Sequence, residues 1–226
     1  GGGHVCESGR VGSRTDQTSN RRYGGVDAES RVRDRRTKLV RAAIDLFGTD
    51  GYAGTSVQAV CDRAGLSKRY FYESFANPEE LLLAAYDAAT ADAQGAVLAA
   101  MEGIADVYEA MVVGIGTYYE YLEQHRPEAA VMFSEILGVS DDVDAAYLRG
   151  TELVTAIVEP LVALADLEHS PPGLPRAITG LIVGAAHLWL MEGCVRPAAE
   201  PTEAVVTVLR ALLGTGADPA RGVSEG

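Results

Sequence analysis

Apolar residues recur at helical spacing along most of the chain, beginning near residue 31. Between residues 31 and 48, two adjacent rows of apolar side chains form a broad stripe on one helical face. The pattern predicts a helix that ends at Gly48 and buries this stripe. The two rows are Leu39, Ala43 and Leu46, and Val40, Ile44 and Phe47.

Two short helices follow, and only a few residues separate them. The first is predicted to begin at Thr55, because Thr55 and Gln58 stand at the spacing of a capping box, and to end at Gly65. The second is predicted to begin at Ser67, a residue type that often caps a helix, and to run to Phe75. Two short helices joined by a turn with glycine form a helix–turn–helix.

The rest of the chain also has the pattern of helices. A fourth helix opens at Asn77 and Pro78, a cap followed by a proline in the first turn, and runs to about Ala93. No segment has the alternation of a strand, so the predicted fold class is all-α. Further helices are predicted over residues 106–125, 128–137, 141–167, 174–194 and 202–213.

Charge is unevenly divided along the chain, whose formal net charge is −13. Up to Phe75 there are 13 Lys and Arg against 9 Asp and Glu, a net +4, and after Phe75 there are 6 against 23, a net −17. Because salt screens charges beyond about 10 Å, a basic head can meet a polyanion although the body is acidic. Incidental arginines in a solvated tail would give the same asymmetry.

The sequence argues against several classes of protein. No apolar run reaches the roughly 18 residues that span a bilayer, and the N-terminus lacks the apolar run of a signal peptide, so we expect a cytoplasmic protein without a membrane partner. Cys6, Cys61 and Cys194 form no paired metal or redox spacing. Because no glycine-rich phosphate loop, metal-binding His/Glu spacing or nucleophile elbow is present, we expect neither a cofactor nor an enzyme. The alternatives are an all-α enzyme, a non-specific or architectural DNA-binding protein, and a ligand-binding partner protein with a vestigial DNA-binding head.

The second helix of the helix–turn–helix has side chains suited to DNA. This motif brings the N-terminal side chains of its second helix to base edges in the major groove. Lys68 and Arg69 stand there, and an arginine can bond both acceptors of a guanine. For Tyr70 and Tyr72, packing on the first helix is the alternative. The predicted DNA contacts are Thr55, Ser56, Ser67, Lys68, Arg69, Tyr70 and Tyr72.

Four short motifs in this region resemble, in order and spacing, the signature of the tetracycline-repressor (TetR) family. The resemblance is dense from about Arg36 to Leu83. In one departure, Pro78 stands where the family often has a lysine before the acidic pair of the fourth helix, which leaves that phosphate contact open. The motifs are Gly51-Tyr52, Thr55-Ser56-Val57, Ala64-Gly65-Leu66-Ser67 and Tyr72-Glu73-Ser74-Phe75.

The resemblance implies a homodimer that binds a double-stranded DNA operator with its three N-terminal helices and a small-molecule effector, of unknown identity, with its C-terminal part. It thereby predicts a sequence-specific transcriptional regulator, a repressor that its ligand releases from the operator. The predicted division of the chain is a disordered arm (1–29), a helix–turn–helix DNA-binding domain (30–77), a helical ligand-binding and dimerisation domain (78–214) and a disordered tail (215–226).

Two sets of residues in the C-terminal part are candidates for these roles. An apolar cavity with a few polar groups would suit a ligand, and the acidic body favours a neutral or cationic ligand over an anionic one. Two helices doubled by a two-fold axis would make a dimer interface. Burial in the monomer core is the alternative for both sets. The ligand candidates are Met111, Ile115, Tyr118, Tyr119, Phe133, His187 and Trp189, and the dimer candidates are Gly180, Gly184, Val205, Leu209 and Leu212.

Overall fold

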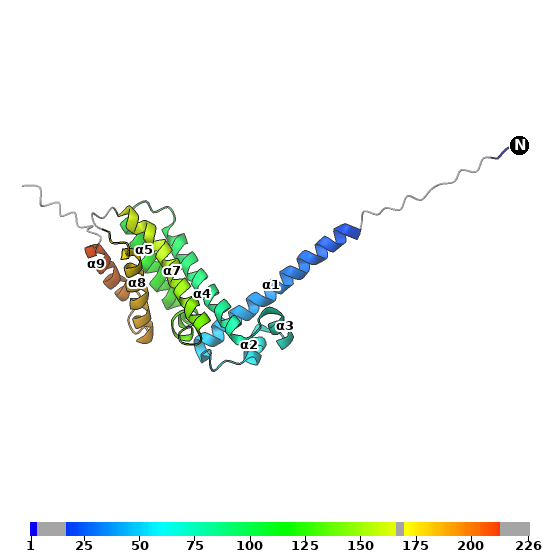
Figure 1. Ribbon diagram of the computed structural model, residues 1–226, viewed down its shortest axis with the longest axis horizontal. Helices are drawn as coiled ribbons and strands as arrows, with labels where there is room; N and C mark the ends of the chain where they lie inside the picture. Colours follow the sequence, from blue (N-terminus) through cyan, green and yellow to red (C-terminus); the bar gives the residue numbers. More distant parts are fainter. Residues whose placement is uncertain (4–16, 166–169, 213–226) are drawn as a thin grey trace, which may run out of the picture.

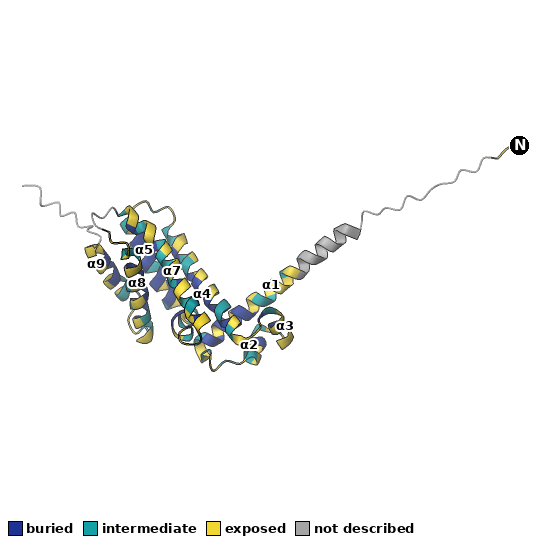
Figure 2. Cartoon of the chain, viewed as in Figure 1, coloured by how far each residue is buried: buried dark blue, intermediate teal, exposed yellow. Residues whose placement is uncertain are grey.

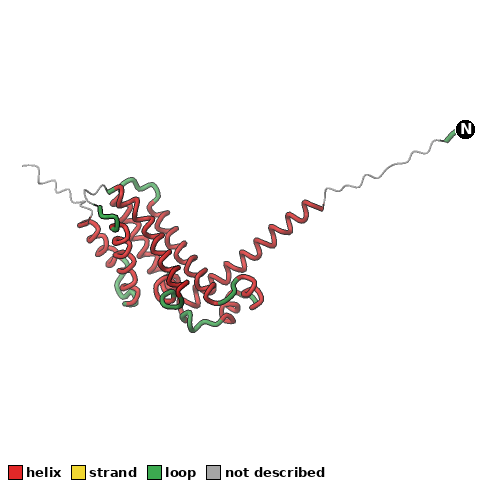
Figure 3. Tube along the Cα trace, viewed as in Figure 1, coloured by secondary structure: helices red, strands yellow, loops and turns green. Residues whose placement is uncertain are grey.

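The computed structural model describes residues 1–3, 17–165 and 170–212 of the chain. Within these ranges the elements are helices and no strand occurs (Figure 3), which confirms the all-α prediction. The predicted disordered tail, residues 215–226, lies outside the described residues.

The chain folds into a small head and a larger helical body (Figure 1). The C-terminal part of α1 packs with two short helices to form the head, and α4 and α5 pack along each other at the centre of the body. The helices of the head are α1 (Gln17–Asp50), α2 (Val57–Ala64) and α3 (Lys68–Ser74). The body contains α4 (Pro78–Met101), α5 (Val107–Gln124), α6 (Arg126–Ala130), the π-helical turn η1 (Val131–Glu135), α7 (Asp141–Leu164), α8 (Leu174–Met191) and α9 (Ala199–Leu212).

The first helix is longer than the sequence pattern predicts. It begins at Gln17, so residues 17–29 of the predicted disordered arm are helical. This part of α1 projects away from the body (Figure 1), and a projecting helix needs no apolar stripe. Once the packed residues from Leu39 onward have formed helix, each further residue adds one backbone hydrogen bond. Apolar periodicity therefore marks only the packed part of α1.

Other helix ends also differ from the predictions. The fourth helix continues to Met101, past its predicted end near Ala93. Arg126 and Pro127, predicted to end a helix, instead begin α6, where proline is tolerated because the first helical residues have no intrahelical partner for their N–H groups. The eighth helix ends at Met191 because the next turn is left-handed, with φ of 75° at Gly193 and 49° at Cys194.

The core is continuous from the head into the body. Buried residues line the inner faces of the helices, and exposed residues line the outer faces (Figure 2). Leu39, Phe71 and Phe75 fill the head, and Leu82, Tyr119 and Leu122 are among the buried side chains of the body. One buried cluster therefore joins the two parts.

Three contacts fix the head against the body. Gly48 of α1 packs against Pro127, and a Cβ added at Gly48 would lie 2.6 Å from the Pro127 carbonyl oxygen and closer still to its Cα. The backbone N–H of Tyr52 donates to Glu135 Oε2 at 2.7 Å. Arg41 forms an ion pair with Asp92 at 2.8 Å. The first two contacts join the end of α1 and the turn after it to the segment formed by α6 and η1. We call this region of contact the joint.

The eighth helix is more apolar than expected for a helix of which so little is buried. It has 18 residues with a mean hydropathy of 1.3, long and apolar enough by these measures to cross a membrane, although the sequence pattern suggested no run of that length. Only 33% of these 18 residues are buried inside the fold. In this fold α8 packs against α7 and α9, so its remaining apolar residues form an outer face of the body.

Substitution of Gly48 tests the close packing at the joint. We expect Gly48→Ala to lower the free energy of unfolding by about 1–3 kcal/mol, because the new methyl group would overlap Pro127. Gly95→Ala is the matched control: Gly95 lies within α4 with no atom near its missing Cβ, so we expect it to be stabilising by about 0.5–1 kcal/mol. Chemical denaturation measures both, and equal effects would contradict the close packing.

Candidate DNA-binding face and ligand cavity

The helix–turn–helix forms as predicted, but a different residue caps its first helix. Ser56, not Thr55, is the N-cap of α2, and its hydroxyl accepts the N–H of Ala59 at 3.1 Å. The predicted capping box is absent because Gln58 donates to Asp62 on the exposed face instead. The Thr55 hydroxyl donates to the Gly51 carbonyl at 2.7 Å. Its single hydrogen is therefore in use, whereas the hydroxyl hydrogen of Ser56 remains available to a phosphate.

The turn between α2 and α3 depends on glycine. Gly65 has φ of 67°, a left-handed conformation that glycine adopts without steric cost, and its N–H bonds the end of α2. The next helix is held from beneath by Phe71 and Phe75, which are buried. Arg36 of α1 donates to the Ser74 carbonyl at 2.6 Å and lies over the Phe75 ring. Arg36 thus anchors α3 and is occupied within the head.

The N-terminal end of α3 presents its polar side chains to solvent. Ser67 is the N-cap by position, but its hydroxyl makes no capping bond, and Ser67, Lys68 and Arg69 are all exposed. Arg69 bonds Glu73 at 2.8 Å, one turn along the helix, and its side chain is 84% exposed. Such a pair contributes little to stability and is easily exchanged for another acceptor. This end of α3 is therefore free to meet DNA.

The two candidate tyrosines of α3 differ in their surroundings. Tyr72 is 61% exposed, and only its ring touches the head, edge-on to Phe71. Tyr70 is half-buried, with the guanidinium of Arg35 4.5 Å above its ring. Tyr72 can thus reach a phosphate, whereas Tyr70 supports the contact between α1 and α3.

An apolar cavity lies inside the body between α4, α5, α7, α8 and α9. Three of the predicted ligand residues, Met111, Ile115 and Tyr118, contribute to its wall. Burial raises the pKa of the Tyr118 hydroxyl, and this hydroxyl donates to no described residue. The other lining residues, which the sequence analysis did not select, are Gln94, Val97, Met101, Gly114, Val154, Ile157, Val158, Leu161, Ile178, Ile182 and Leu209.

The four remaining ligand candidates lie outside this cavity. Tyr119 is fully buried, and its hydroxyl donates to the Ile182 carbonyl at 2.9 Å. The indole N–H of Trp189 donates to the Arg196 carbonyl at 2.9 Å. His187 is half-buried and packs against the ring of Phe133, which lines a neighbouring hollow. Tyr119 and Trp189 therefore have structural partners that account for their burial.

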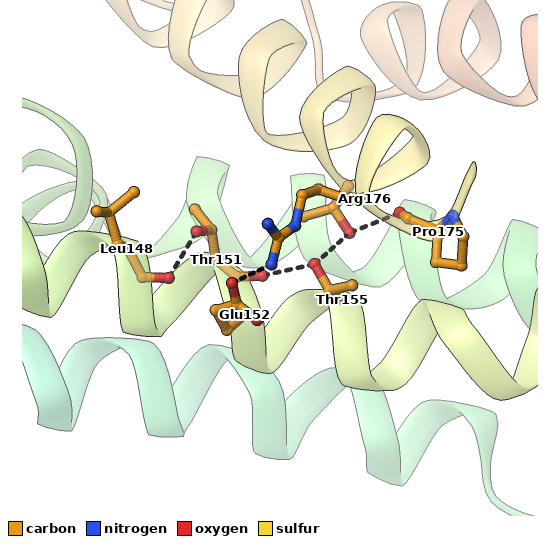
Figure 4. Close-up of polar contacts among 7 residues, drawn as sticks. Leu148, Thr151, Glu152, Thr155, Pro175 and Arg176 are labelled. Carbon is orange, nitrogen blue, oxygen red and sulfur yellow. Dashed lines mark hydrogen bonds and ion pairs between the residues drawn. The ribbon is translucent and has the colours of Figure 1, made fainter. Parts of the chain in front are cut away.

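Polar contacts connect the two helices that form one side of the cavity (Figure 4). The Thr155 hydroxyl of α7 lies 3.0 Å from the Thr179 hydroxyl of α8. Nearer the surface, Arg176 of α8 forms an ion pair with Glu152 of α7. These contacts hold α7 against α8 where both contribute apolar side chains to the cavity.

The dimer candidates divide into an outer and an inner group. Gly180 and Gly184 are exposed, and Leu212 is 52% exposed. Val205 and Leu209, by contrast, are each only 2% exposed and face the core of their own chain. The outer residues belong to an apolar face, which we call the α8/α9 face. Its other exposed residues are Ala177, Leu188, Met191, Ala204, Val208 and Ala211.

Comparison with known proteins places the head in a family. Residues 39–85 match the family described as bacterial regulatory proteins, tetR family. The HTH-type transcriptional activator FasR of Mycolicibacterium smegmatis is 24% identical over 183 residues, which cover 80% of this chain and 82% of FasR.

Solved structures share the fold of about three quarters of this chain. FadR from Bacillus subtilis, in complex with stearoyl-CoA, has a TM-score of 0.66 at 16% identity and covers 76% of this chain and 96% of its own. AibR, in complex with isovaleryl coenzyme A and operator DNA, has a TM-score of 0.61 at 17% identity and covers 77% of this chain and 97% of its own. At these identities the likeness concerns the fold alone.

The two adjacent tyrosines of α5 differ in what their hydroxyl groups do: that of Tyr119 stabilises the fold, whereas that of Tyr118 belongs to the wall of the cavity. We expect Tyr119→Phe to lower the free energy of unfolding by about 0.5–1.5 kcal/mol, because it removes the buried hydrogen bond to Ile182. Tyr118→Phe should change stability by less than this, because its hydroxyl has no partner among the described residues. Thermal and urea denaturation measure the difference, and an equal loss in both variants would contradict these assignments.

Proposed function

The chain is a TetR-family helix–turn–helix transcriptional regulator and not an enzyme, and from this premise we propose that it is a repressor that a small molecule with an acyl chain releases from its operator. The observation that carries the proposal is the apolar cavity lined by residues of α4, α5, α7, α8 and α9. The proposal has three parts: sequence-specific DNA binding by α3, dimerisation by the α8/α9 face, and control by the ligand.

The exposed end of α3 supports the first part. Ser67, Lys68 and Arg69 stand at the N-terminus of α3, where a recognition helix meets base edges. Ser56 and Tyr72 flank them with hydroxyl groups suited to phosphates. Two such helices in a dimer would sit about 34–36 Å apart, one turn of DNA, over a near-palindromic site.

The α8/α9 face supports the second part. Leu188 is 66% exposed and Met191 is 73% exposed, which leaves large apolar side chains in water unless a partner covers them. Gly180 and Gly184 have no atom near their missing Cβ positions, so another helix can approach closely there. A two-fold axis through this face would bury it against its own copy.

The cavity and the relatives support the third part. The wall of the cavity is almost entirely hydrocarbon, which suits an acyl chain. FadR of Bacillus subtilis and AibR, which share this fold, bind stearoyl-CoA and isovaleryl coenzyme A respectively. We therefore propose the acyl thioesters of coenzyme A as the ligand class for this chain.

The joint supplies a route from the cavity to the head. Met132 and Phe133 of η1 border a hollow beside the cavity, and Glu135, at the end of the same turn, accepts the N–H of Tyr52 in the head. A ligand that displaces η1 would therefore shift the head, and with it the spacing of the two recognition helices. It changes DNA binding only by its difference in affinity for the two arrangements.

Selection of bound sequences from a random duplex pool, at near-physiological salt, tests the DNA-binding part. We expect enrichment of a two-fold-symmetric site, which then serves to assay isovaleryl-CoA, octanoyl-CoA and stearoyl-CoA as releasing ligands. FasR is described as an activator, so the direction of regulation needs its own test. Loss of operator binding on addition of an acyl-CoA supports release, and tighter binding would contradict it.

Arg69 provides the sharpest test of base reading. If it bonds a guanine, Arg69→Ala costs about 1–3 kcal/mol of operator binding and relaxes the preference at one base pair. Because its ion pair with Glu73 is exposed, the variant should unfold at the same temperature as the wild type. Mobility shifts on operator and random duplexes measure the effect. Equal losses on both would mark Arg69 as a phosphate contact.

Leu188 tests the dimer interface. We expect Leu188→Asp to convert the dimer to monomers and to weaken operator binding, because a charge would be buried without a partner. Leu148→Asp is the matched control, since Leu148 is 63% exposed but lies on α7, away from the α8/α9 face. Sedimentation gives the mass of each variant. A dimer that survives Leu188→Asp would contradict this interface.

A further inference from the structure

Three hollows adjoin one another along α4. The first is the apolar cavity. The second lies between α4, α5, η1 and α7, and the third is a groove at the surface between α4 and α7. The outer residues of this groove, which we call the α4–α7 groove, are exposed and include Asp87, Ala91 and Arg149. Within the described residues, Gln94 is the one side chain that borders all three hollows.

Gln94 places an amide group without a hydrogen-bond partner where the three hollows meet, a position that we call the junction. Its Nε2 atom is buried and forms no hydrogen bond. A buried amide without a partner destabilises the protein, because it has lost its bonds to water and gained none. An acceptor atom placed beside Nε2 would satisfy the amide. No backbone carbonyl or side chain of the described residues supplies that acceptor.

A second group without a partner lies one turn away on the same face of α4. Thr90 is 6% exposed, and its hydroxyl forms no well-aligned hydrogen bond with any described residue, although it lies close enough to the Tyr86 hydroxyl to lower the pKa of that group. The neighbouring Tyr86 hydroxyl donates instead to the Tyr147 carbonyl at 3.4 Å. Burial raises the pKa of Tyr86 to about 12, a rise that the nearby Thr90 partly offsets. A Cβ at Gly150 would overlap the Tyr86 hydroxyl, so glycine at this position keeps Tyr86 against α7.

We propose that Gln94 and Thr90 bind the carbonyl oxygen of the ligand, with its acyl chain in the apolar cavity and the remainder of the molecule leaving through the α4–α7 groove. This rests on the proposed function, which supplies the acyl thioester as ligand class, and it adds the residues that recognise the thioester and the orientation of the ligand.

The charges around the junction favour a thioester over a free fatty acid. Burying a carboxylate is costly unless a cation or several hydrogen-bond donors compensate its charge, and Arg149 is the one cationic side chain that borders these three hollows in the described chain. Arg149 is exposed in the outer groove and interacts with Asp87, not with Gln94. A thioester carbonyl is uncharged and accepts hydrogen bonds, which matches a neutral amide and a hydroxyl.

Binding to matched ligand pairs tests the carbonyl contact. The probes are isovaleryl-CoA, octanoyl-CoA and stearoyl-CoA, each paired with the S-alkyl-CoA thioether of equal length, in which a methylene group replaces the carbonyl. For the tightest-binding length, we expect full-length wild-type protein to bind the thioester about tenfold more tightly than the thioether in calorimetric titration, since the thioether leaves Nε2 without an acceptor.

Substitution at the junction should remove this preference. In Gln94→Leu we expect the thioester to lose about tenfold in affinity while the thioether keeps its wild-type affinity, and Thr90→Val should give a smaller change in the same direction. The melting temperature of ligand-free Gln94→Leu should not fall, because no hydrogen bond of the ligand-free protein is lost. A purely structural glutamine would instead lower it. Gln124→Leu, an exposed glutamine at the end of α5, is the control that keeps the preference.

A second pair of variants tests the orientation. Ala91→Trp should slow association of the acyl-CoA about tenfold in stopped-flow measurements, because Ala91 borders the α4–α7 groove. Ala99→Trp, also exposed on α4 but outside the three hollows, should leave the rate unchanged.

The outcomes separate this inference from the proposed function. Equal wild-type affinities for thioester and thioether, or a preference that survives Gln94→Leu, overturn the assignment of Gln94 and leave the ligand class standing. Equal association rates in the two tryptophan variants overturn the orientation. If the wild type binds none of the six probes, the proposed ligand class fails, and this inference fails with it.

Discussion

The contact between the end of α1 and the segment of α6 and η1 is the constraint on which the rest of the structure depends. A recognition helix can select a sequence only if its position relative to its dimer partner is fixed. In this chain the position of the head relative to its own body is set where Gly48 packs against Pro127 and the Tyr52 N–H meets Glu135. Packed interiors transmit strain, so under the proposed function a change at the joint would alter the position of α3 on DNA.

The body combines a well-packed core with a small region in which buried polar groups have no hydrogen-bond partners. Tyr119, Trp189 and Thr179 are buried polar side chains with hydrogen-bond partners, and they stabilise one arrangement of α5, α8 and the loop before α9. Gln94 and Thr90 each hold a buried polar atom without a well-aligned partner among the described residues; Gln94 lines the apolar cavity, and both line the hollow beside it. A buried polar group without a partner calls for an explanation, and a ligand that contributes the missing bond is the explanation that we propose.

The head could be predicted from sequence far better than the ligand site. The Gly65 turn and the apolar rows of α1 are local signals, and they fix the helix–turn–helix. The cap at Ser56 was missed because Thr55 has the same chemistry, and only the φ and ψ angles decide between them. The cavity depends on which helices are neighbours, so Trp189 looked as suitable as Met111. One signal for Gln94 was available: it follows Tyr86 and Thr90 at i+4 spacing on an otherwise apolar face of α4.

The distribution of arginines limits how the chain can hold an acyl-CoA. Coenzyme A is polyanionic, but the described arginines after Phe75 have other partners. Arg176 and Arg196 pair with glutamates, Arg210 donates to Tyr108, and Arg126 donates to the Glu123 carbonyl. Only Arg149 borders the groove, beside Asp87. In a body of net charge −17, little attraction is available for the phosphates. If the ligand is an acyl-CoA, as proposed, most of its affinity would come from the apolar cavity, and discrimination from the thioester carbonyl.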